Sequence, residues 1–503
     1  MTFQLANAAG HTRDLASLLP TQLLSEEQAG IEVSGIQNDS RKVVRGDLFL
    51  ALPGIQTDGS RYIKQAMEKG AAAILMEADS NYSDSGNGSI KPIAIEKLSQ
   101  QSGQIAARFY GEPSSALNVV AITGTNGKTS CGRIIAELAE QLGHKCMVIG
   151  TTGYGFPNHL DKASHTTPDA IELQKLLAWG KEQGAEMVSM EVSSHGLAQN
   201  RLSGVEVNTA IFTNLTRDHL DYHGSMESYG DAKRKLFLQP GLNHAIINLD
   251  DSFGRELLQD LSTDISGLSY SLISKEADIY ANKIDSATGI FADIKTPWGE
   301  GKINSALLGE FNLSNLLAAI AALCVSGVAL DKVLVGIESL KPIEGRMESF
   351  GGEKSQPIVI VDFAHTPDAL EKALAQLQQM NHEKLICVFG CGGDRDKGKR
   401  PLMGSVAAQY CDHLIVTDDN PRNENPKDIT NEIISSVKGL VTHEVIHDRC
   451  DAIKSAIHRA GQRDIVLVAG KGHEQTQEYA TSSIHFCDRT VVQEILNGDA
   501  TNV

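Results

Sequence analysis

A glycine-rich loop with the composition of a phosphate-binding site follows the apolar segment 117–123. Its residues run Gly124-Thr125-Asn126-Gly127-Lys128-Thr129, and a helix is expected directly afterwards. Glycines let successive backbone N–H groups turn toward an anion, and the start of a helix adds a favourable dipole. Lys128 can supply charge to the β- and γ-phosphates of a nucleotide, and Thr129 a hydroxyl for Mg²⁺. The full P-loop pattern has a glycine where Ile122 stands, so this loop is a shortened variant.

Acids and histidines follow two other apolar segments of strand length. Glu191 lies at the end of the segment 187–192, and the sequence Asp218-His219-Leu220-Asp221-Tyr222-His223 comes soon after the segment 209–213. Magnesium prefers oxygen ligands, so an acid at the end of a strand near a phosphate loop is a candidate ligand. Glu191 is also compatible with capping a loop, and each histidine with a surface position. The residue types alone leave both interpretations open.

Strand-length apolar segments alternate with segments of helical period from residue 30 almost to the end, which is typical of α/β architecture. Ligands of parallel α/β sheets bind at the carboxyl ends of the strands, so the loops just after these strands are the expected binding sites. The expected strands are 47–52, 71–76, 117–123, 145–149, 187–192, 209–213, 357–361, 384–389, 413–417 and 464–469.

The chain length indicates more than one domain, because 503 residues at roughly 150 per domain give about three. A helix expected over residues 98–110 connects the first unit to the second. We therefore predict an α/β protein of three domains. A small α/β domain would cover residues 1–97, a central P-loop ATPase-like parallel-sheet domain 98–344, and a Rossmann-like domain 345–503.

The composition is that of a globular protein, with 41% hydrophobic and 21% charged residues. The net charge of −18 argues against non-specific binding to nucleic acid or to an anionic membrane, which needs a basic surface. The N-terminal residues lack a basic head followed by an apolar run, and no stretch approaches 18 apolar residues, so neither a secretory signal nor a membrane span is expected. The eight scattered cysteines fit reduced thiols in a cytoplasmic protein.

Nine ordered motifs, spread over most of the chain, give the sequence a strong resemblance to the Mur ligases. This family contains ATP-dependent amino-acid ligases of peptidoglycan precursor synthesis. The motifs are GTNGKTS (124–130), MEVSSHGL (190–197), FTNLTRDHLDYHG (212–224), LGEFNLSN (308–315), GRMESF (345–350), DFAHTPDAL (362–370), GCGGDRDKGKRPLMG (390–404), DDNPR (418–422) and GKGHE (470–474).

The resemblance implies the reaction. ATP would phosphorylate the D-glutamyl carboxylate of UDP-N-acetylmuramoyl-L-alanyl-D-glutamate, and the incoming amine would displace phosphate from the acyl phosphate. Thr129 and Glu191 would hold one Mg²⁺, and His219 would help to hold a second. Lys233 would be N-carboxylated by CO₂, which turns it into an anionic metal ligand. Lys128 belongs to the same catalytic set. The resemblance assigns Gly124, Thr125, Asn126, Gly127, Lys128, Thr129, Ser130, Asn312, Arg346, Asp362 and His365 to ATP.

The resemblance also implies where the UDP-sugar peptide binds, across the first and second domains. The matching residues are Asn38, Ser40, Ile55, Gln56, Thr57, His165, Thr166, Thr167, Ser193, Gln199 and Arg201. Two positions depart from the common pattern of the family. His165 stands where asparagine is frequent, and Phe363 where tyrosine is frequent.

The loop at 418–422 predicts the amino acid that is added. Arg395 and Arg422 can each bind a carboxylate with a planar fork of donors, whereas they would repel the side chain of lysine. Since meso-diaminopimelate carries a second carboxylate at its far end, and the family members that add it share this loop, we expect it to be the substrate. The resemblance assigns Arg395, Asp419, Asn420, Pro421, Arg422, Gly470 and Glu474 to its site, with Glu474 facing the distal ammonium.

Three other functions are compatible with the phosphate loop: the lysine-adding ligase of the same family, a folylpolyglutamate synthetase, and a nucleotide-driven switch that changes the shape of a partner. The segment Asn38-Asp39-Ser40-Arg41, the loop at 418–422 and the dedicated first domain argue against a folylpolyglutamate synthetase. We expect a monomer whose partners are its substrates, with ATP and Mg²⁺ as cofactors.

Overall fold

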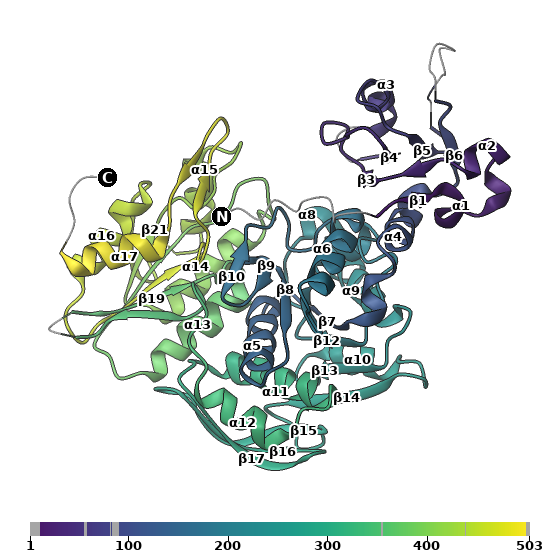
Figure 1. Cartoon of the computed structure of the whole chain (residues 1–503). Helices are drawn as coiled ribbons and strands as arrows, with labels where there is room; N and C mark the ends of the chain where they lie inside the picture. Colours follow the sequence, from purple (N-terminus) through teal and green to yellow (C-terminus); the bar gives the residue numbers. More distant parts are fainter. Residues whose placement is uncertain are drawn as a thin grey trace.

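Three large β-sheets, each with apolar cores of its own, follow one another along the described part of the chain (Figure 1). Two small antiparallel sheets of two strands each, β1-β2 and β24-β25, accompany them. The computed structural model describes residues 11–54, 58–80, 82, 90–353, 356–437 and 439–498. Among these residues, no helix is both long enough and apolar enough to cross a membrane. The eight cysteines are free thiols, and seven of them are buried.

The first sheet consists of four parallel strands in the order β3-β4-β5-β6. Their side chains pack on short helices and on α4, a helix that leads into the second sheet. The elements are β1 (Arg13–Asp14), α1 (Leu15–Leu18), η1 (Thr21–Leu23), α2 (Glu26–Ala29), β2 (Glu32–Val33), β3 (Gly35–Gln37), β4 (Asp47–Ala51), η2 (Gly59–Tyr62), α3 (Ile63–Glu68), β5 (Ala73–Glu77), β6 (Ile93–Ile95) and α4 (Leu98–Phe109).

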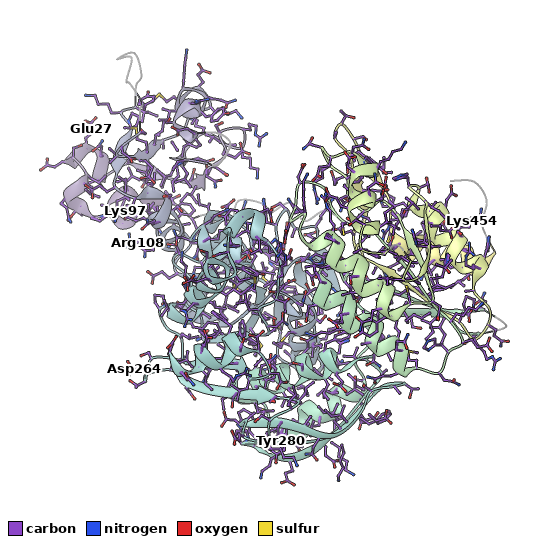
Figure 2. All side chains as sticks on the ribbon, turned by 180° about the vertical axis from the view of Figure 1, so that it is seen from behind. Glu27, Lys97, Arg108, Asp264, Tyr280 and Lys454 are labelled. Atoms are coloured by element: carbon purple, nitrogen blue, oxygen red, sulfur yellow. The ribbon has the colours of Figure 1, made fainter. Side chains whose placement is uncertain are left out.

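Helix α4 joins the first sheet to the rest of the molecule. It packs against α6, whose Ile171 and Ala178 belong to the apolar core of the first sheet. Figure 2 shows Lys97 and Arg108, near the two ends of α4, at this junction. The backbones are close here, because a Cβ at Gly103 would lie 2.0 Å from the carbonyl oxygen of Ser203.

The central sheet has eleven strands in the order β10-β9-β8-β11-β7-β12-β13-β14-β15-β16-β17. The seven from β8 to β15 are parallel, which confirms the predicted parallel sheet. Antiparallel pairs at both edges, β9–β10 and β16–β17, were not predicted. The strands are β7 (Asn118–Thr123), β8 (Cys146–Gly150), β9 (Gly153–Phe156), β10 (His159–Asp161), β11 (Met187–Glu191), β12 (Thr209–Phe212), β13 (His244–Asn248), β14 (Ser266–Ser271), β15 (Ile279–Asp285), β16 (Ile290–Thr296) and β17 (Gly299–Ser305).

Apolar helices cover both faces of the central sheet, as long buried parallel strands require. Helices α5, α11 and α12 share one core with the sheet, and α6 belongs to the core on the other face. The elements are η3 (Pro113–Ala116), α5 (Lys128–Gln141), α6 (Ala170–Glu182), α7 (Ser194–Ala198), α8 (Leu220–His223), α9 (Met226–Arg234), η4 (Lys235–Leu238), α10 (Ser252–Gln259), α11 (Glu310–Val325) and α12 (Leu330–Glu338).

The third sheet has the order β18-β19-β23-β20-β21-β22, and only β18 is antiparallel. Helices α13 to α15 cover one face, and α16 and α17 the other, which fits the predicted Rossmann-like domain. The elements are β18 (Glu348–Gly351), β19 (Ile358–Asp362), α13 (Pro367–Gln379), β20 (Leu385–Phe389), α14 (Lys399–Tyr410), β21 (His413–Val416), α15 (Pro426–Ile434), β22 (Thr442–Val445), α16 (Arg449–Arg459), β23 (Ile465–Ala469), β24 (Thr476–Glu478), β25 (Ser483–His485) and α17 (Asp488–Asn497).

Candidate active site

A cavity of about 630 Å³ lies where the loops of the second and third sheets face each other. It contains most of the residues that the sequence assigned to ATP and all but one of those assigned to diaminopimelate. The predicted residues in its wall are Thr125, Asn126, Gly127, Lys128, Thr129, Ser130, Thr166, Glu191, Ser193, His219, Arg346, Asp362, His365, Arg395, Asp419, Asn420, Arg422, Gly470 and Glu474.

The remaining predicted residues are not in the wall of this cavity. Ile55, Gln56 and Thr57 lie outside the described residues. Asn312 is buried directly behind the wall: its amide donates to the carbonyl oxygen of Leu308 at 2.9 Å, and it accepts from the wall residue Asn315 at 3.3 Å. The others are Gly124, Lys233, Asn38, Ser40, His165, Thr167, Gln199, Arg201 and Pro421.

The phosphate loop has the backbone that its glycines predict. Gly124 and Gly127 have φ angles of +154° and +87°, a region that side chains disfavour. A Cβ at Gly124 would also lie 1.9 Å from the hydroxyl of Thr213. The Nζ of Lys128 donates to the carbonyl oxygens of Gly124 and Thr125 at 2.8 and 2.9 Å, so the lysine folds back over its own loop.

A hydrogen-bonded group of three side chains lies beside the phosphate loop at the end of β11. The hydroxyl of Thr129 donates to Oε2 of Glu191 at 2.9 Å. Arg346, from the segment that precedes the third sheet, donates to the same hydroxyl at 3.0 Å. Both Thr129 and Glu191 are buried, at 4% and 3% exposure. Two hard oxygen donors at the cavity wall fit a magnesium ion.

Thr151, a residue that sequence reasoning missed, fixes Glu191 from the other side. Its backbone N–H donates to Oε1 of Glu191 at 2.8 Å, and its hydroxyl to Oε2 at 3.1 Å. The same hydroxyl lies 3.1 Å from the hydroxyl of Thr166. The only sequence signal for Thr151 is its position directly after the strand β8.

Three basic side chains surround Asp218 at the boundary between the second and third sheets. Its carboxylate lies 3.4 Å from His219, 3.7 Å from His365 and 3.5 Å from Lys399. Burial alone would raise the pKa of Asp218, but His365 and Lys399 outweigh burial and hold it well below its ordinary value. Burial lowers the pKa of His219 to about 3, so its imidazole is neutral at pH 7 and can act as a ligand.

Lys233 is inside the protein, at 1% exposure, on helix α9. Its Nζ lies 4.3 Å from the centre of the Tyr229 ring. The ring of His219 lies 6.0 Å from the same ring, so Tyr229 brings these two predicted residues into one neighbourhood. Burial and the charge of Lys128 lower the pKa of Lys233 well below its ordinary value. Among the described residues, no three His, Cys, Asp or Glu side chains converge to hold a metal ion.

The two domains are held together around the cavity by polar contacts between distant residues. Arg217 donates to both carboxylate oxygens of Asp396, at 3.1 and 3.2 Å. The amide of Asn126, in the phosphate loop, donates to Asp368 at 3.0 Å. The first contact joins the segment after β12 to the segment that contains Arg395, and the second joins the phosphate loop to helix α13.

The loops after β21 and β23 form the end of the cavity that was predicted to bind the amino acid. The amide of Asn420 donates to Oε2 of Glu474 at 2.9 Å, and Arg422 donates to the carbonyl oxygen of Gly393 at 2.9 Å. Gly470 has a φ of +115°, and a Cβ there would lie 2.7 Å from Asp419. This end of the cavity therefore presents two arginines beside two acids.

A fully buried ion pair supports these two loops from behind. Arg449 and Asp488 are both 0% exposed and bond at 2.7 and 2.8 Å. The same guanidinium donates to the carbonyl oxygens of Asp418 and Ala469, at the roots of the two loops.

Replacing Asp488 by asparagine should destabilise the third domain by about 3 kcal/mol, because the charge of Arg449 would remain buried without its partner. The urea midpoint of that domain, followed by circular dichroism, measures the effect. Glu383→Gln breaks the exposed Arg463–Glu383 pair and serves as the control, with an expected change below about 1 kcal/mol. Equal effects of the two substitutions would contradict the supporting role.

The residues predicted to bind the UDP-sugar peptide form two groups. Thr167 accepts from the backbone of Ser193 at 2.9 Å, and Arg201 donates to Gln199 and to the carbonyl oxygen of Thr167. These residues are therefore linked to the cavity wall through Ser193. Asn38 and Ser40 lie in the first domain, beyond that wall, and Ser40 donates to Gln65 at 2.6 Å. His165 is exposed and bonds to Ser164.

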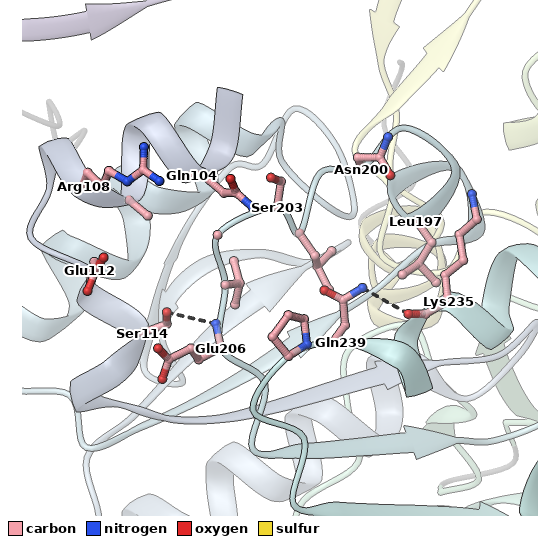
Figure 3. A pocket seen from close by; sticks show the side chains of 15 residues that line it. Gln104, Arg108, Glu112, Ser114, Leu197, Asn200, Ser203, Glu206, Lys235 and Gln239 are labelled. Carbon is pink, nitrogen blue, oxygen red and sulfur yellow. Dashed lines mark hydrogen bonds between the residues drawn. The ribbon is translucent and has the colours of Figure 1, made fainter. Parts of the chain in front are cut away.

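A second cavity, of about 380 Å³, lies between α4, η3 and the segment that follows α7 (Figure 3). Its wall contains none of the predicted site residues. Arg108 and Lys235 are matched there by Glu112 and Glu206, so the charges in the wall are balanced. It has no feature of a phosphate or carboxylate site.

Three family models match consecutive parts of the chain. They describe a Mur ligase family catalytic domain over residues 32–110, a Mur ligase middle domain over 122–323, and a Mur ligase glutamate ligase domain over 345–472.

Individual relatives extend the likeness over almost the whole chain. A protein of Coxiella burnetii named UDP-N-acetylmuramoyl-L-alanyl-D-glutamate–2,6-diaminopimelate ligase is 46% identical, over 92% of this chain and 95% of its own length. A solved structure with that enzyme name is 36% identical, with a TM-score of 0.70, and the match covers 98% of this chain and 100% of the other. The MurF ligase of Thermotoga maritima, solved in complex with ADP, shares the fold, with 18% identity, a TM-score of 0.63, and coverage of 92% of this chain and 98% of its own.

Proposed function

The chain belongs to the Mur ligase family, and from that premise we propose that it is an ATP-dependent ligase of peptidoglycan precursor synthesis. It joins meso-2,6-diaminopimelate to the D-glutamyl carboxylate of UDP-N-acetylmuramoyl-L-alanyl-D-glutamate. The observation that carries the proposal is that the wall of one cavity contains both residues of the phosphate loop and the pair Arg395 and Arg422.

The reaction needs activation because a carboxylate is a poor electrophile. A carboxylate oxygen of the D-glutamyl residue takes the γ-phosphoryl group of ATP, and ADP leaves. The amine of the second substrate then attacks the acyl carbon, loses a proton, and inorganic phosphate leaves. Lys128 and the backbone N–H groups of residues 124–130 stabilise the charge on the transferred group. This role agrees with the position of the Lys128 Nζ over its own loop.

Magnesium is proposed as the cofactor that neutralises the phosphate oxygens. Thr129 and Glu191 would hold one ion, and their hydrogen-bonded oxygens at the cavity wall support this. His219 and Lys233 would serve a second ion. Lys233 suits this role after its amine adds to CO₂ and loses a proton, because the resulting carbamate is anionic. Burial of Lys233 and the nearby charge of Lys128 favour the neutral amine that this addition requires.

The charged side chains of the amino-acid site match the two charged groups at the distal end of diaminopimelate. Arg395 and Arg422 would receive its carboxylate and Glu474 its ammonium, with Asp419, Asn420, Pro421 and Gly470 shaping the site. Lysine has no carboxylate to place between the arginines. The relatives that match over almost their full length carry the name of the diaminopimelate-adding enzyme, which favours neither the lysine-adding ligase nor a folylpolyglutamate synthetase.

The sugar-peptide substrate would enter from the side of the first domain. Thr166 and Ser193 lie at the cavity wall, Thr167 bonds to Ser193, and Arg201 bonds to Thr167 and Gln199. His165 directly precedes Thr166 and is exposed. Asn38 and Ser40, with Ile55, Gln56 and Thr57, remain the proposed uridine contacts. We further propose a monomer in the cytoplasm, in keeping with eight unpaired thiols.

Phosphate release from ATP tests this function directly. We expect release only when the UDP-dipeptide and an amino acid are both present, and at least about a hundredfold higher kcat/KM for diaminopimelate than for lysine, because lysine loses two charge-assisted contacts. Comparable values for the two amino acids would contradict the substrate assignment. Release of phosphate without either substrate would favour a nucleotide-driven switch.

A further inference from the structure

We propose that Lys471 is a positioning residue that sets the amino-acid specificity of the site, an inference that rests on the function proposed above. Its ammonium orients the Asn420 amide and the Glu474 carboxylate toward the substrate. Lys471 lies between Gly470 and Glu474 in the sequence but is not itself in the cavity wall.

Lys471 is completely buried, at 0% exposure, and its three N–H donors find three acceptors. The Nζ donates to Oδ1 of Asn420 at 3.1 Å, to Oε2 of Glu474 at 2.8 Å and to the carbonyl oxygen of Thr476 at 2.7 Å. An ammonium has no further donor to offer. Lys471 therefore acts on the cavity only through Asn420 and Glu474, both of which are in its wall.

The contact with Lys471 determines which way the amide of Asn420 points. Its Oδ1 accepts from Lys471 and, at 3.0 Å, from the backbone N–H of Glu478, while its Nδ2 donates to Glu474. The reversed amide would place an NH₂ group against two donors. Lys471 thus makes the remaining N–H of Asn420 the group available to a ligand, and an N–H donor suits a substrate carboxylate.

The two carboxylate oxygens of Glu474 have different surroundings. Its Oε2 accepts from both Lys471 and Asn420. Within the described part of the chain, Oε1 accepts no hydrogen bond, and the side chain is 34% exposed. One oxygen therefore remains for a substrate ammonium, in an orientation that the other oxygen fixes.

Charge explains why this arrangement discriminates between amino acids. Arg395, Arg422 and Lys471 together exceed Asp419 and Glu474 by one positive charge. A distal group that carries both a carboxylate and an ammonium is accepted there, whereas a lone ammonium meets a Glu474 already compensated by Lys471. Lys471 thereby disfavours lysine as well as favouring diaminopimelate.

The test is steady-state kinetics of Lys471→Met, which keeps the length of the side chain and removes its charge. We expect KM for diaminopimelate to rise at least about tenfold, KM for ATP to stay within about twofold, and the preference for diaminopimelate over lysine to fall at least about tenfold. Lys471→Arg should recover part of the preference. Lys454→Met, on the far side of the third domain from the first (Figure 2), is the matched control and should change none of these values.

Parallel changes in all KM values, or an unchanged preference, would overturn the inference. The double variant Lys471→Met/Glu474→Gln should lose less than the sum of the two single losses, because Lys471 acts in part through Glu474; fully additive losses would count against the inference. If Lys471→Met does not fold, Asn420→Asp provides the test. This substitution keeps the oxygen that accepts from Lys471 but removes the N–H donor that faces the substrate. An unchanged KM for diaminopimelate would then refute the inference. Absence of diaminopimelate-dependent turnover in the unmodified enzyme would instead reject the proposed function.

Discussion

Lys233→Ala should reduce kcat by about a thousandfold, which is the order of the rate loss when one preorganised electrostatic contact to the reacting group is removed. Lys233 is buried beside Tyr229 and has no surface role to lose. As a carbamate it would supply negative charge to the metal site, and alanine can supply none. Phosphate release with saturating substrates measures the effect.

Added carboxylates distinguish a lost ligand from a damaged fold. Acetate or formate should raise the activity of Lys233→Ala at least about tenfold, because a small anion can occupy the space of the carbamate. Lys235→Ala, two residues further along with an exposed side chain, is the control and should remain fully active with or without them. Full activity of Lys233→Ala without any additive would refute the carbamate.

Replacing Lys128 by methionine should lower kcat/KM for ATP by at least about a thousandfold, since phosphoryl transfer depends on charge and positioning. Burial lowers the pKa of Lys128, while Glu191 and Asp218 raise it. Bound phosphates would add negative charge and hold the lysine in its charged form. The loss should therefore appear at every pH at which the enzyme is folded.

Binding measurements separate this effect from misfolding. Calorimetric titration with the UDP-dipeptide should give an affinity within about threefold of the unmodified protein, since its proposed contacts do not include Lys128. Lys145→Met replaces an exposed lysine of the same domain and should retain full turnover. A Lys128→Met variant with ordinary kinetics for ATP would remove the phosphate loop from the mechanism.

The sequence alone predicted the parts of the site that are formed by consecutive residues. Residues 124–130 determine their own backbone through Gly124 and Gly127, so the loop could be predicted from its spacing. The strands that precede the functional loops were also predicted to within two residues, because their buried apolar segments are continuous. The antiparallel strands at the edges of the central sheet were not predicted. In β16 buried and exposed residues alternate from Ile290 to Thr296, but the exposed Phe291 is apolar, which weakens the alternation of apolar and polar residues in the sequence.

The contacts between domains could not be predicted in the same way. Asp218 meets Lys399 across 181 positions of sequence, and Arg346 reaches Thr129 across 217. No local pattern marks such pairs, because each depends on how two separately folded sheets face each other. The motif GKGHE suggested Gly470 and Glu474 but not Lys471, whose burial only the packed structure reveals.

The separate apolar cores have a consequence for how the molecule melts. No residue beyond Ala178 belongs to the two described cores of the first sheet, and α4 and α6 are their main link to the rest. The first domain should therefore form a cooperative unit of its own, and a calorimetric scan should resolve more than one transition. Ligands held between the second and third domains stabilise only the units that contact them. Nucleotide should thus shift the transitions of the second and third domains and leave that of the first domain in place, so that no single melting temperature describes the protein.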